Sequence, residues 1–209
     1  GLPVVVLTGS HDEYASLAAV REGVQDYLVK GEADGRRVAR SIRYAIERER
    51  AEEKIRHQNA IIEGINRILS EALTSDSEEE LGRACLSVAE EVTHSAFGFI
   101  GELNAEGMLD AIAISDPGGQ ACRVRGGGPS AGAFKVHGVF GRVVLDGKGF
   151  FTNDPRRHPD SVGTPEGHPP IHAFLGTPLK HEGKTIGVVA VANRDGGYRP
   201  QDLEALESL

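Results

Sequence analysis

The chain has 209 residues, of which 39% are hydrophobic and 26% are charged, a composition typical of a folded protein large enough for one domain and part of another. Its net charge of −8 argues against general nucleic-acid binding, because phosphate backbones require a cationic surface. It contains no apolar stretch of membrane-spanning length and opens with no signal-peptide pattern, so we expect a cytoplasmic protein.

The first thirty residues predict two strands joined by a helix. Val4–Leu7 is an apolar run without alternation, typical of a parallel strand buried on both faces, and Thr8 follows it. A helical stretch then closes at Gly23, and the second strand runs from Tyr27 into Lys30. This order favours a parallel pair whose hydroxyl and ammonium groups, at neighbouring strand ends, could bind one phosphoryl group.

The segments PVVVLTG (3–9) and 15–31 resemble the second half of a response-regulator receiver domain, which has a flavodoxin-like fold. The resemblance implies that residues 1–35 are a partial receiver and that Thr8, Tyr27 and Lys30 are remnants of its phosphorylation switch. In that family the phosphoacceptor aspartate lies on an earlier strand, so we expect this chain not to accept a phosphoryl group itself. The alternative is that Thr8 and Lys30 merely cap strands of an ordinary α/β unit.

A proline-free helix is predicted over residues 36–73, as the last receiver helix continuing into a signalling helix. After the charged run 47–54, apolar residues recur at seven-residue steps, which is typical of a coiled-coil dimer seam. The predicted seam of a homodimer consists of Ile55, Ile62, Ile65 and Leu69. The alternative is that this stretch packs as the first helix of the next domain, and we expect both: a dimer stalk first and a domain helix after it.

The region 74–209 predicts a mixture of helices and antiparallel strands. Ser77 and Glu80 form a capping-box pattern before an amphipathic helix that ends near His94. A glycine-rich stretch, 118–132, lacks the ending of a phosphate-binding loop, and we expect a mobile loop there. The other predicted elements are strands 96–103, 108–115, 149–153, 173–179 and 185–192, a helix over 138–145, a long loop over 154–170, and a last helix from Pro200.

This order, with FLGTPLKHEGKTIGVVAVANR (174–194) and YRPQDLEAL (198–206), resembles a GAF domain. The resemblance implies an α+β sensory domain over 74–209, with a central antiparallel sheet and a small-molecule cavity. Cyclic-nucleotide-binding members carry an Asn-Lys, Phe, Asp-Glu signature. Asn193, Arg194, Tyr198 and Asp202 stand in matching order here, while Leu203 replaces the final Glu, so the pattern favours the fold and identifies no ligand.

Polar residues gather in the long loop, which in this fold resembles the lid over the ligand cavity. With a residue from the helix before it, the ligand-binding candidates are Phe140, Asn153, Asp154, His158, His168 and His172. A metal site formed by the three histidines and Asp154 is the alternative. Their spacing matches no zinc motif, and Pro169 with Pro170 prevents a helix there, so we expect no metal and identify no cofactor.

The two cysteines weigh against two further activities of this fold. Phytochrome-like relatives attach a bilin through a cysteine commonly followed by His, whereas Cys122 is followed by Arg123. Free methionine sulfoxide reductases use several catalytic cysteines, whereas Cys85 falls on the predicted buried face of a helix. Without a disulfide framework, the pair fits a reducing compartment.

We therefore expect a sensory module of a phosphorelay protein, with no catalysis in this chain and a histidine kinase or other output domain beyond Leu209. Its expected partners are a second copy, through the helix, and an unidentified small molecule. The alternatives are an input module of a cyclic-di-nucleotide cyclase or phosphodiesterase, or of a transcription activator, and a GAF-fold redox enzyme.

Overall fold

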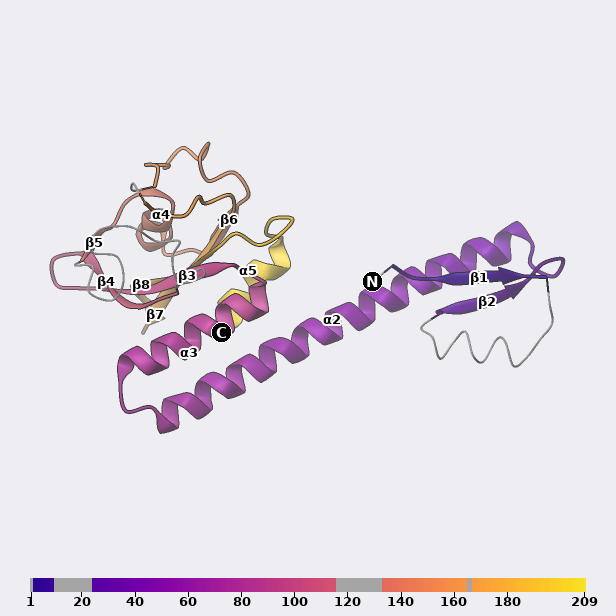
Figure 1. Ribbon diagram of the computed structural model, residues 1–209, viewed down its shortest axis with the longest axis horizontal. Helices are drawn as coiled ribbons and strands as arrows, with labels where there is room; N and C mark the ends of the chain where they lie inside the picture. Colours follow the sequence, from indigo (N-terminus) through magenta and orange to yellow (C-terminus); the bar gives the residue numbers. More distant parts are fainter. Residues whose placement is uncertain (1, 10–23, 116–132, 165–166) are drawn as a thin grey trace. The chain divides into compact units, whose positions relative to one another are not determined.

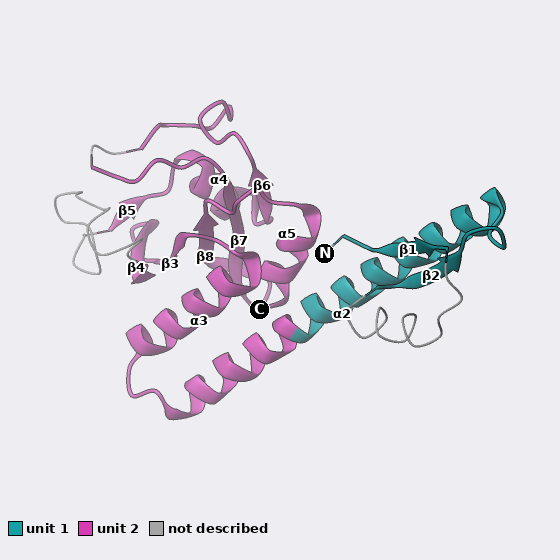
Figure 2. Cartoon of the chain, turned by 45° about the vertical axis from the view of Figure 1, so that its right-hand side comes forward, with its two compact units in different colours: residues 1–59 teal, residues 60–209 magenta. Residues whose placement is uncertain are grey.

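The structure is a computed structural model that describes residues 2–9, 24–115, 133–164 and 167–209. The chain divides into two compact units, residues 1–59 and 60–209, shown in Figure 2. The division falls inside the longest helix, α2 (Gly35–Thr74). In the described part of the chain, no helix is both long enough and apolar enough to cross a membrane.

The first unit contains a parallel strand pair, as the sequence predicted. Strand β1 (Val5–Thr8) pairs with β2 (Asp26–Val29), with Val6 opposite Tyr27. Beyond the pair, the backbone N–H of Lys30 donates to the carbonyl oxygen of Thr8 at 2.6 Å, so the two strand ends lie side by side. The helix expected before Gly23 lies outside the described residues.

The prediction that the first strand is buried on both faces is wrong. Val4 is 47% exposed and Leu7 is 49% exposed. A cleft of about 310 Å³ lies between the strands and the start of α2, lined by Pro3, Val5, Leu7, Leu28, Val38, Ile42 and Ala45. Two short strands offer too little surface for close packing on both faces, which accounts for the exposure.

Helix α2 is present as predicted, and its last turns belong to the second unit. Ile61 and Ile68 pack there against a cluster formed by α3 (Glu78–Thr93) and α5 (Pro200–Ser208). A Cβ atom on Gly64 would lie 2.6 Å from Val88 Cγ1, so glycine permits this close approach of α2 and α3. Of the predicted seam, Ile65 is partly buried, whereas Ile55, Ile62 and Leu69 are 56%, 56% and 57% exposed.

The second unit is built on a six-stranded antiparallel sheet, which confirms the predicted fold class. The spatial order is β5-β4-β3-β8-β7-β6. The strands are β3 (Phe97–Leu103), β4 (Met108–Ile114), β5 (Phe134–Lys135), β6 (Phe150–Thr152), β7 (Phe174–His181) and β8 (Lys184–Ala192). The expected hairpin joins β3 to β4. The glycine-rich stretch from Gly118 lies outside the described residues.

Helices cover both faces of this sheet. Figure 1 shows α3 and α5 on one side and α4 (Gly138–Asp146) on the other. Alternate residues of β8 follow the same division: Val189 and Val191 join the cluster on the α3 side, whereas Val188 and Ala190 join the cluster on the α4 side. Because both faces are buried, β8 is a nearly continuous apolar run.

The predicted start of α3 is also confirmed. The backbone N–H of Glu80 donates to Ser77 Oγ at 3.2 Å, and three acidic residues occupy the first turn, where they interact favourably with the helix dipole. At the other end, His94 takes the left-handed conformation with φ of 54°.

Candidate ligand-binding cavity

A cavity of about 580 Å³ lies on the α4 side of the sheet, within the size range of small-molecule sites. The start of β3 and the end of β8 form its floor, and the first turn of α4 contributes to its walls with residues from 155–164 and 168–171. The residues around it are Phe97, Gly98, Phe99, Ile114, Ser115, Phe134, Gly138, Val139, Phe140, Pro155, Arg156, Ser161, Val162, Gly163, Thr164, His168, Pro169, Ile171, Phe174, Ala190, Val191 and Ala192.

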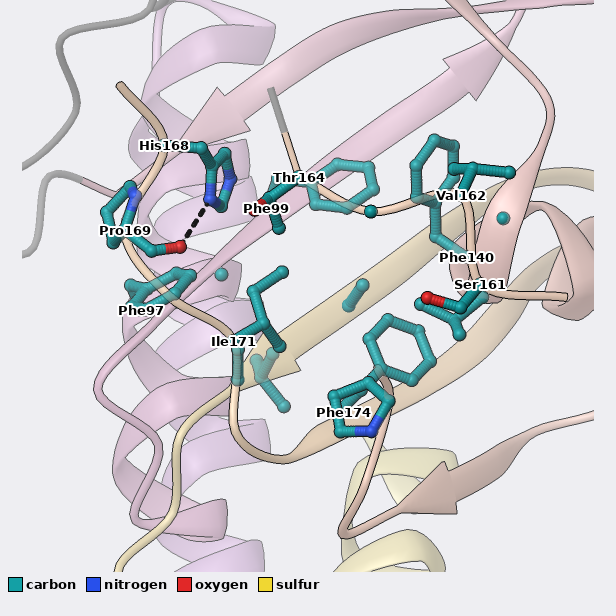
Figure 3. A pocket seen from close by; sticks show the side chains of 18 of the residues that line it. Phe97, Phe99, Phe140, Ser161, Val162, Thr164, His168, Pro169, Ile171 and Phe174 are labelled. Atoms are coloured by element: carbon teal, nitrogen blue, oxygen red, sulfur yellow. Dashed lines mark hydrogen bonds between the residues drawn. The ribbon is translucent and has the colours of Figure 1, made fainter. Parts of the chain in front are cut away.

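Aromatic rings form much of the wall. Phe99 and Phe140 meet edge to face, with ring centroids 5.6 Å apart and planes at 88°. Phe97 and His168 make a second edge contact, at 6.1 Å. Figure 3 shows Phe140 with Phe174 on one side of the space and the Phe97–His168 pair on the other. Such walls suit a flat, largely apolar ligand.

His168 presents a hydrogen-bond acceptor to the cavity. Its Nδ1 lies 2.7 Å from the carbonyl oxygen of Pro169, drawn as the dashed line in Figure 3. Because a carbonyl oxygen only accepts, Nδ1 must carry the proton of this bond. In the neutral ring Nε2 is then the acceptor.

The other polar lining residues differ in whether they are already paired. Ser115 Oγ accepts from the backbone N–H of Gly98 at 2.7 Å and lies 3.2 Å from the Gly98 carbonyl oxygen. By contrast, the side chains of Arg156, Ser161 and Thr164 have no hydrogen-bond or ion-pair partner within residues 2–9, 24–115, 133–164 and 167–209. All three come from one segment, residues 155–164.

The structure brings two of the six predicted ligand-binding residues, Phe140 and His168, to the cavity. Asn153 instead bonds to the backbone of Tyr198 on both sides: Nδ2 donates to its carbonyl oxygen at 3.0 Å, and Oδ1 accepts from its N–H at 2.7 Å. Asp154 lies 3.5 Å from Arg157 Nε.

The remaining two candidates are histidines outside the cavity lining. His158 Nδ1 accepts from the backbone N–H of Asp160 at 3.3 Å, and its ring lies 5.3 Å from that of Phe150. His172 is exposed, and its backbone N–H donates to Asn193 Oδ1. Among the residues with described positions, no three His, Cys, Asp or Glu side chains are grouped to hold a metal ion.

The signature-like residues gather in the connection from β8 to α5 and the first residues of α5, which together we call the corner (residues 193–202). Asn193, with φ of +62°, accepts from His172 N–H at 2.8 Å and donates through Nδ2 to the Pro170 carbonyl oxygen at 2.8 Å. Asn193 thereby fixes the chain on either side of Ile171, which lines the cavity.

The rest of the corner is a buried polar network. Asp202 is 1% exposed; its Oδ2 accepts from the backbone N–H of Arg199 at 2.7 Å, and its Oδ1 lies 3.4 Å from Arg194 Nε. The Tyr198 hydroxyl bonds to Ser95 Oγ at 2.7 Å, and burial raises the pKa of Tyr198 to about 12. None of these residues lines the cavity.

Two partly buried groups on α3 lie outside both regions. Burial raises the pKa of Glu90, and the Ser115 hydroxyl lowers it by less. Within the described ranges, Glu90 Oε1 is buried without a hydrogen-bond partner. Burial also raises the pKa of Cys85, which packs against the cluster on the α3 side, as its position in the sequence predicted. Cys122 lies outside the described residues.

Most of the cavity was not predicted from the sequence. The strand residues Phe97, Phe99 and Phe174 have the pattern of core residues, because a strand position facing a cavity and one facing the core are both apolar. Ser161 and Thr164 lie in the loop that was expected to form the lid, and that position is the signal that could have identified them.

The amino-acid sequence matches the profile of the GAF domain over residues 75–209. The fold is similar to the GAF domain of a phosphoenolpyruvate-protein phosphotransferase from Coxiella burnetii, with 15% identity, a TM-score of 0.59, and coverage of 69% of this chain and 84% of that one.

Two further solved structures share the fold. A methyl-accepting chemotaxis protein fragment has 18% identity, a TM-score of 0.54, and coverage of 67% of this chain and 88% of that one. A free methionine-R-sulfoxide reductase from Neisseria meningitidis, solved with its substrate, has 16% identity, a TM-score of 0.53, and coverage of 71% and 84%. At these identities the likeness concerns the fold alone. On the profile match and this architecture, the chain belongs to the GAF domain family, a family of sensory domains in signalling proteins.

Proposed function

We propose that residues 75–209 sense a small organic molecule bound in the cavity. The observation that carries this proposal is the cavity itself, about 580 Å³ with aromatic walls and unpaired polar side chains along one segment. In a closed core this space would be filled by side chains. An apolar space bordered by free donors is the arrangement expected of a ligand site.

The corner offers a route from the cavity to the last helix. A ligand touching Ile171 contacts a segment whose two ends are bonded to Asn193, and Asn193 begins the connection into α5. A ligand that binds more tightly to one of two positions of this segment favours that position and the position of α5 that goes with it. The difference between its two affinities sets the size of the shift. Binding is thereby reported at a distance without chemical change.

Fluorescence tests the cavity directly, because the chain contains no tryptophan. Phe140→Trp places a single indole in the wall, and Leu145→Trp, at a position on the same helix that is 75% exposed, is the matched control. The uncharged aromatic probe N-phenyl-1-naphthylamine should change the emission of Phe140→Trp saturably and leave Leu145→Trp unaffected. An equal response of both variants would show surface adsorption and contradict the proposal.

We also infer that the chain forms a homodimer through α2. Ile55, Ile62 and Leu69 lie seven residues apart, each more than half exposed, while Ile61 and Ile68 pack into their own domain. A stripe with this spacing is covered when a second helix packs on it. Ile62→Asp should lower the dimer fraction in sedimentation experiments, whereas Leu145→Asp, another exposed position, should not. An unchanged dimer fraction in Ile62→Asp would contradict this assignment.

We further propose that residues 1–35 are the carboxyl-terminal half of a receiver domain, with Thr8, Tyr27 and Lys30 as its switch residues. The parallel register and the bond from Lys30 N–H to Thr8 support this proposal. The chain would then be the input part of a cytoplasmic phosphorelay protein with a histidine kinase as output. Sequencing the gene on both sides tests this: a phosphoacceptor Asp upstream and a phosphorylatable His with an ATP-binding domain downstream are expected, and a cyclase or DNA-binding domain would contradict the kinase.

A further inference from the structure

We propose that the ligand of the cavity is an aromatic carboxylate, held with its ring system on the sheet and its carboxylate at Arg156. This inference rests on the proposed ligand-binding function and adds the charge and shape of the ligand. It follows from the charges around the cavity, from the unpaired donors and from where the apolar and polar residues lie.

Among the described residues, the cavity wall carries one arginine and no acidic side chain. The chain has 31 acidic and 23 basic residues, yet Arg156 is among the described lining residues and no Asp or Glu is. A cationic ligand would leave water without a counter-charge, at a high cost in free energy. An anion would meet a guanidinium, which pairs with carboxylates through two parallel hydrogen bonds.

The carboxylates near Arg156 in the sequence are paired with other arginines. Asp154 lies 3.5 Å from Arg157 Nε, and Asp160 lies 3.4 Å from Arg142 Nη1. Arg156 itself has no ion-pair partner within the described ranges. Its guanidinium is therefore available to a ligand, although the net charge of the whole protein repels anions.

Hydroxyl donors accompany this guanidinium. Ser161 and Thr164 lie in the same segment, and neither side chain has a hydrogen-bond partner in the part of the chain that the structure describes. Figure 3 shows Ser161 beside Phe140 and Val162, and Thr164 near Phe99. Carboxylate oxygens are acceptors only, so they match a set of free donors.

Apolar residues from the sheet define the other end of the ligand. Phe97, Phe99, Phe174 and Ala190 come from the sheet and present rings and a methyl group. A flat aromatic body can lie on them while its charged end stays at the partly hydrated edge formed by Arg156 and Thr164, both exposed. The ligand then keeps part of the hydration of its carboxylate, which reduces the cost of binding.

A matched pair of probes tests the charge requirement: 2-naphthoate, which is ionised at pH 7, and 2-naphthamide, which has nearly the same shape and no charge. Titration of the full chain by calorimetry should show naphthoate binding about tenfold more tightly than naphthamide. Raising the salt concentration should weaken naphthoate binding and leave naphthamide binding unchanged. The cation 2-naphthylmethylammonium should bind more weakly than both.

Two neighbouring arginines supply the variants. Arg156→Gln should reduce the naphthoate preference to about twofold, because it removes the charge-assisted bonds. Arg157→Gln should retain the tenfold preference, since Arg157 does not line the cavity and its side chain is 89% exposed. If both probes bound equally, or if Arg156→Gln kept the preference, the proposal of a carboxylate ligand would be wrong, whereas the proposal that the cavity binds a ligand would still hold. Failure of both probes and of N-phenyl-1-naphthylamine to bind would overturn the ligand site as well.

Discussion

The corner and the cavity are neighbouring regions that differ in whether their polar side chains are hydrogen-bonded within the protein. In the corner, the polar groups of Asn193, Tyr198 and Asp202 are bonded within the protein. In the cavity wall, Arg156 and Thr164 belong to no hydrogen bond or ion pair in the described structure. The comparison teaches that polar residues of a sequence signature can stabilise the fold, whereas polar residues that line a cavity without a protein partner are better candidates for ligand binding.

The largest effect is expected at Asp202. Asp202→Ala removes the acceptor for Arg199 N–H and leaves the Arg194 guanidinium, whose side chain is 14% exposed, without its counter-charge. We expect the free energy of unfolding in urea to fall by about 3 kcal/mol. Asp195→Ala, an exposed position in the same connection, is the control. A loss no greater than that of the control would remove the distinction between corner and cavity.

The second prediction concerns the alkaline stability of the corner. Tyr198 keeps its proton in the folded state to a pKa of about 12, against an ordinary value of 10 in the unfolded chain. The stability linked to this shift is present below pH 10 and is lost as the pH rises from 10 to 12. Over this range the free energy of unfolding of the wild type should fall by about 2 to 3 kcal/mol more than that of Tyr198→Phe. Urea unfolding of both proteins at pH 9 and pH 12 measures the difference, and parallel losses would show that Tyr198 is not responsible.

The third prediction compares a hydroxyl that bonds to the corner with a hydroxyl in the cavity wall. Ser95 Oγ bonds to Tyr198 and to Thr93 Oγ1, whereas the Thr164 side chain has no partner in the described structure. Ser95→Ala should lower the unfolding free energy by about 1 kcal/mol, and Thr164→Val by less than about 0.5 kcal/mol. Calorimetric melting temperatures of the two variants test this order. A larger loss in Thr164→Val would mean that its hydroxyl serves the fold.

The smallest effect is expected at Glu90, which belongs to neither region. Burial raises the pKa of its carboxyl, so the folded state carries a cost for the charged form at pH 7 and none below the pKa of the unfolded chain. Glu90→Gln should therefore raise the unfolding free energy by about 0.5 kcal/mol at pH 7 and leave it unchanged at pH 4. The same gain at both pH values would point to packing as the cause.

The sequence predicted elements whose signals are local. Ser77 and Glu80 predicted the start of α3, and the apolar residues of 185–192 predicted the strand β8. It failed at β1, where the same apolar pattern belongs to a two-stranded pair with Leu7 half exposed. An apolar run indicates which residues could be buried, and only the number of packed neighbours decides whether they are.

The candidate site was predicted only in part, for the same physical reason. Polar loop residues such as Asn153 and His158 were chosen because of their chemistry, but their hydrogen bonds are made within the protein. The apolar floor at Phe99 could not be distinguished from core, since side-chain type does not reveal whether the space opposite is filled. Phe140 and His168 were predicted because the loop expected to cover the ligand carries His168 and the helix before it carries Phe140, and both residues line the cavity.

The cavity also depends on which alternate residues of β8 face it. Ala190 and Ala192, which line it, alternate along β8 with the larger Val189 and Val191. Both valines pack in the cluster on the α3 side, and Val191 also borders the cavity. A shift of β8 by one residue against its neighbours would exchange small side chains for branched ones along the floor. The empty volume is therefore encoded by which positions of one strand carry alanine, and an insertion in β8 would close the site without altering a single polar group.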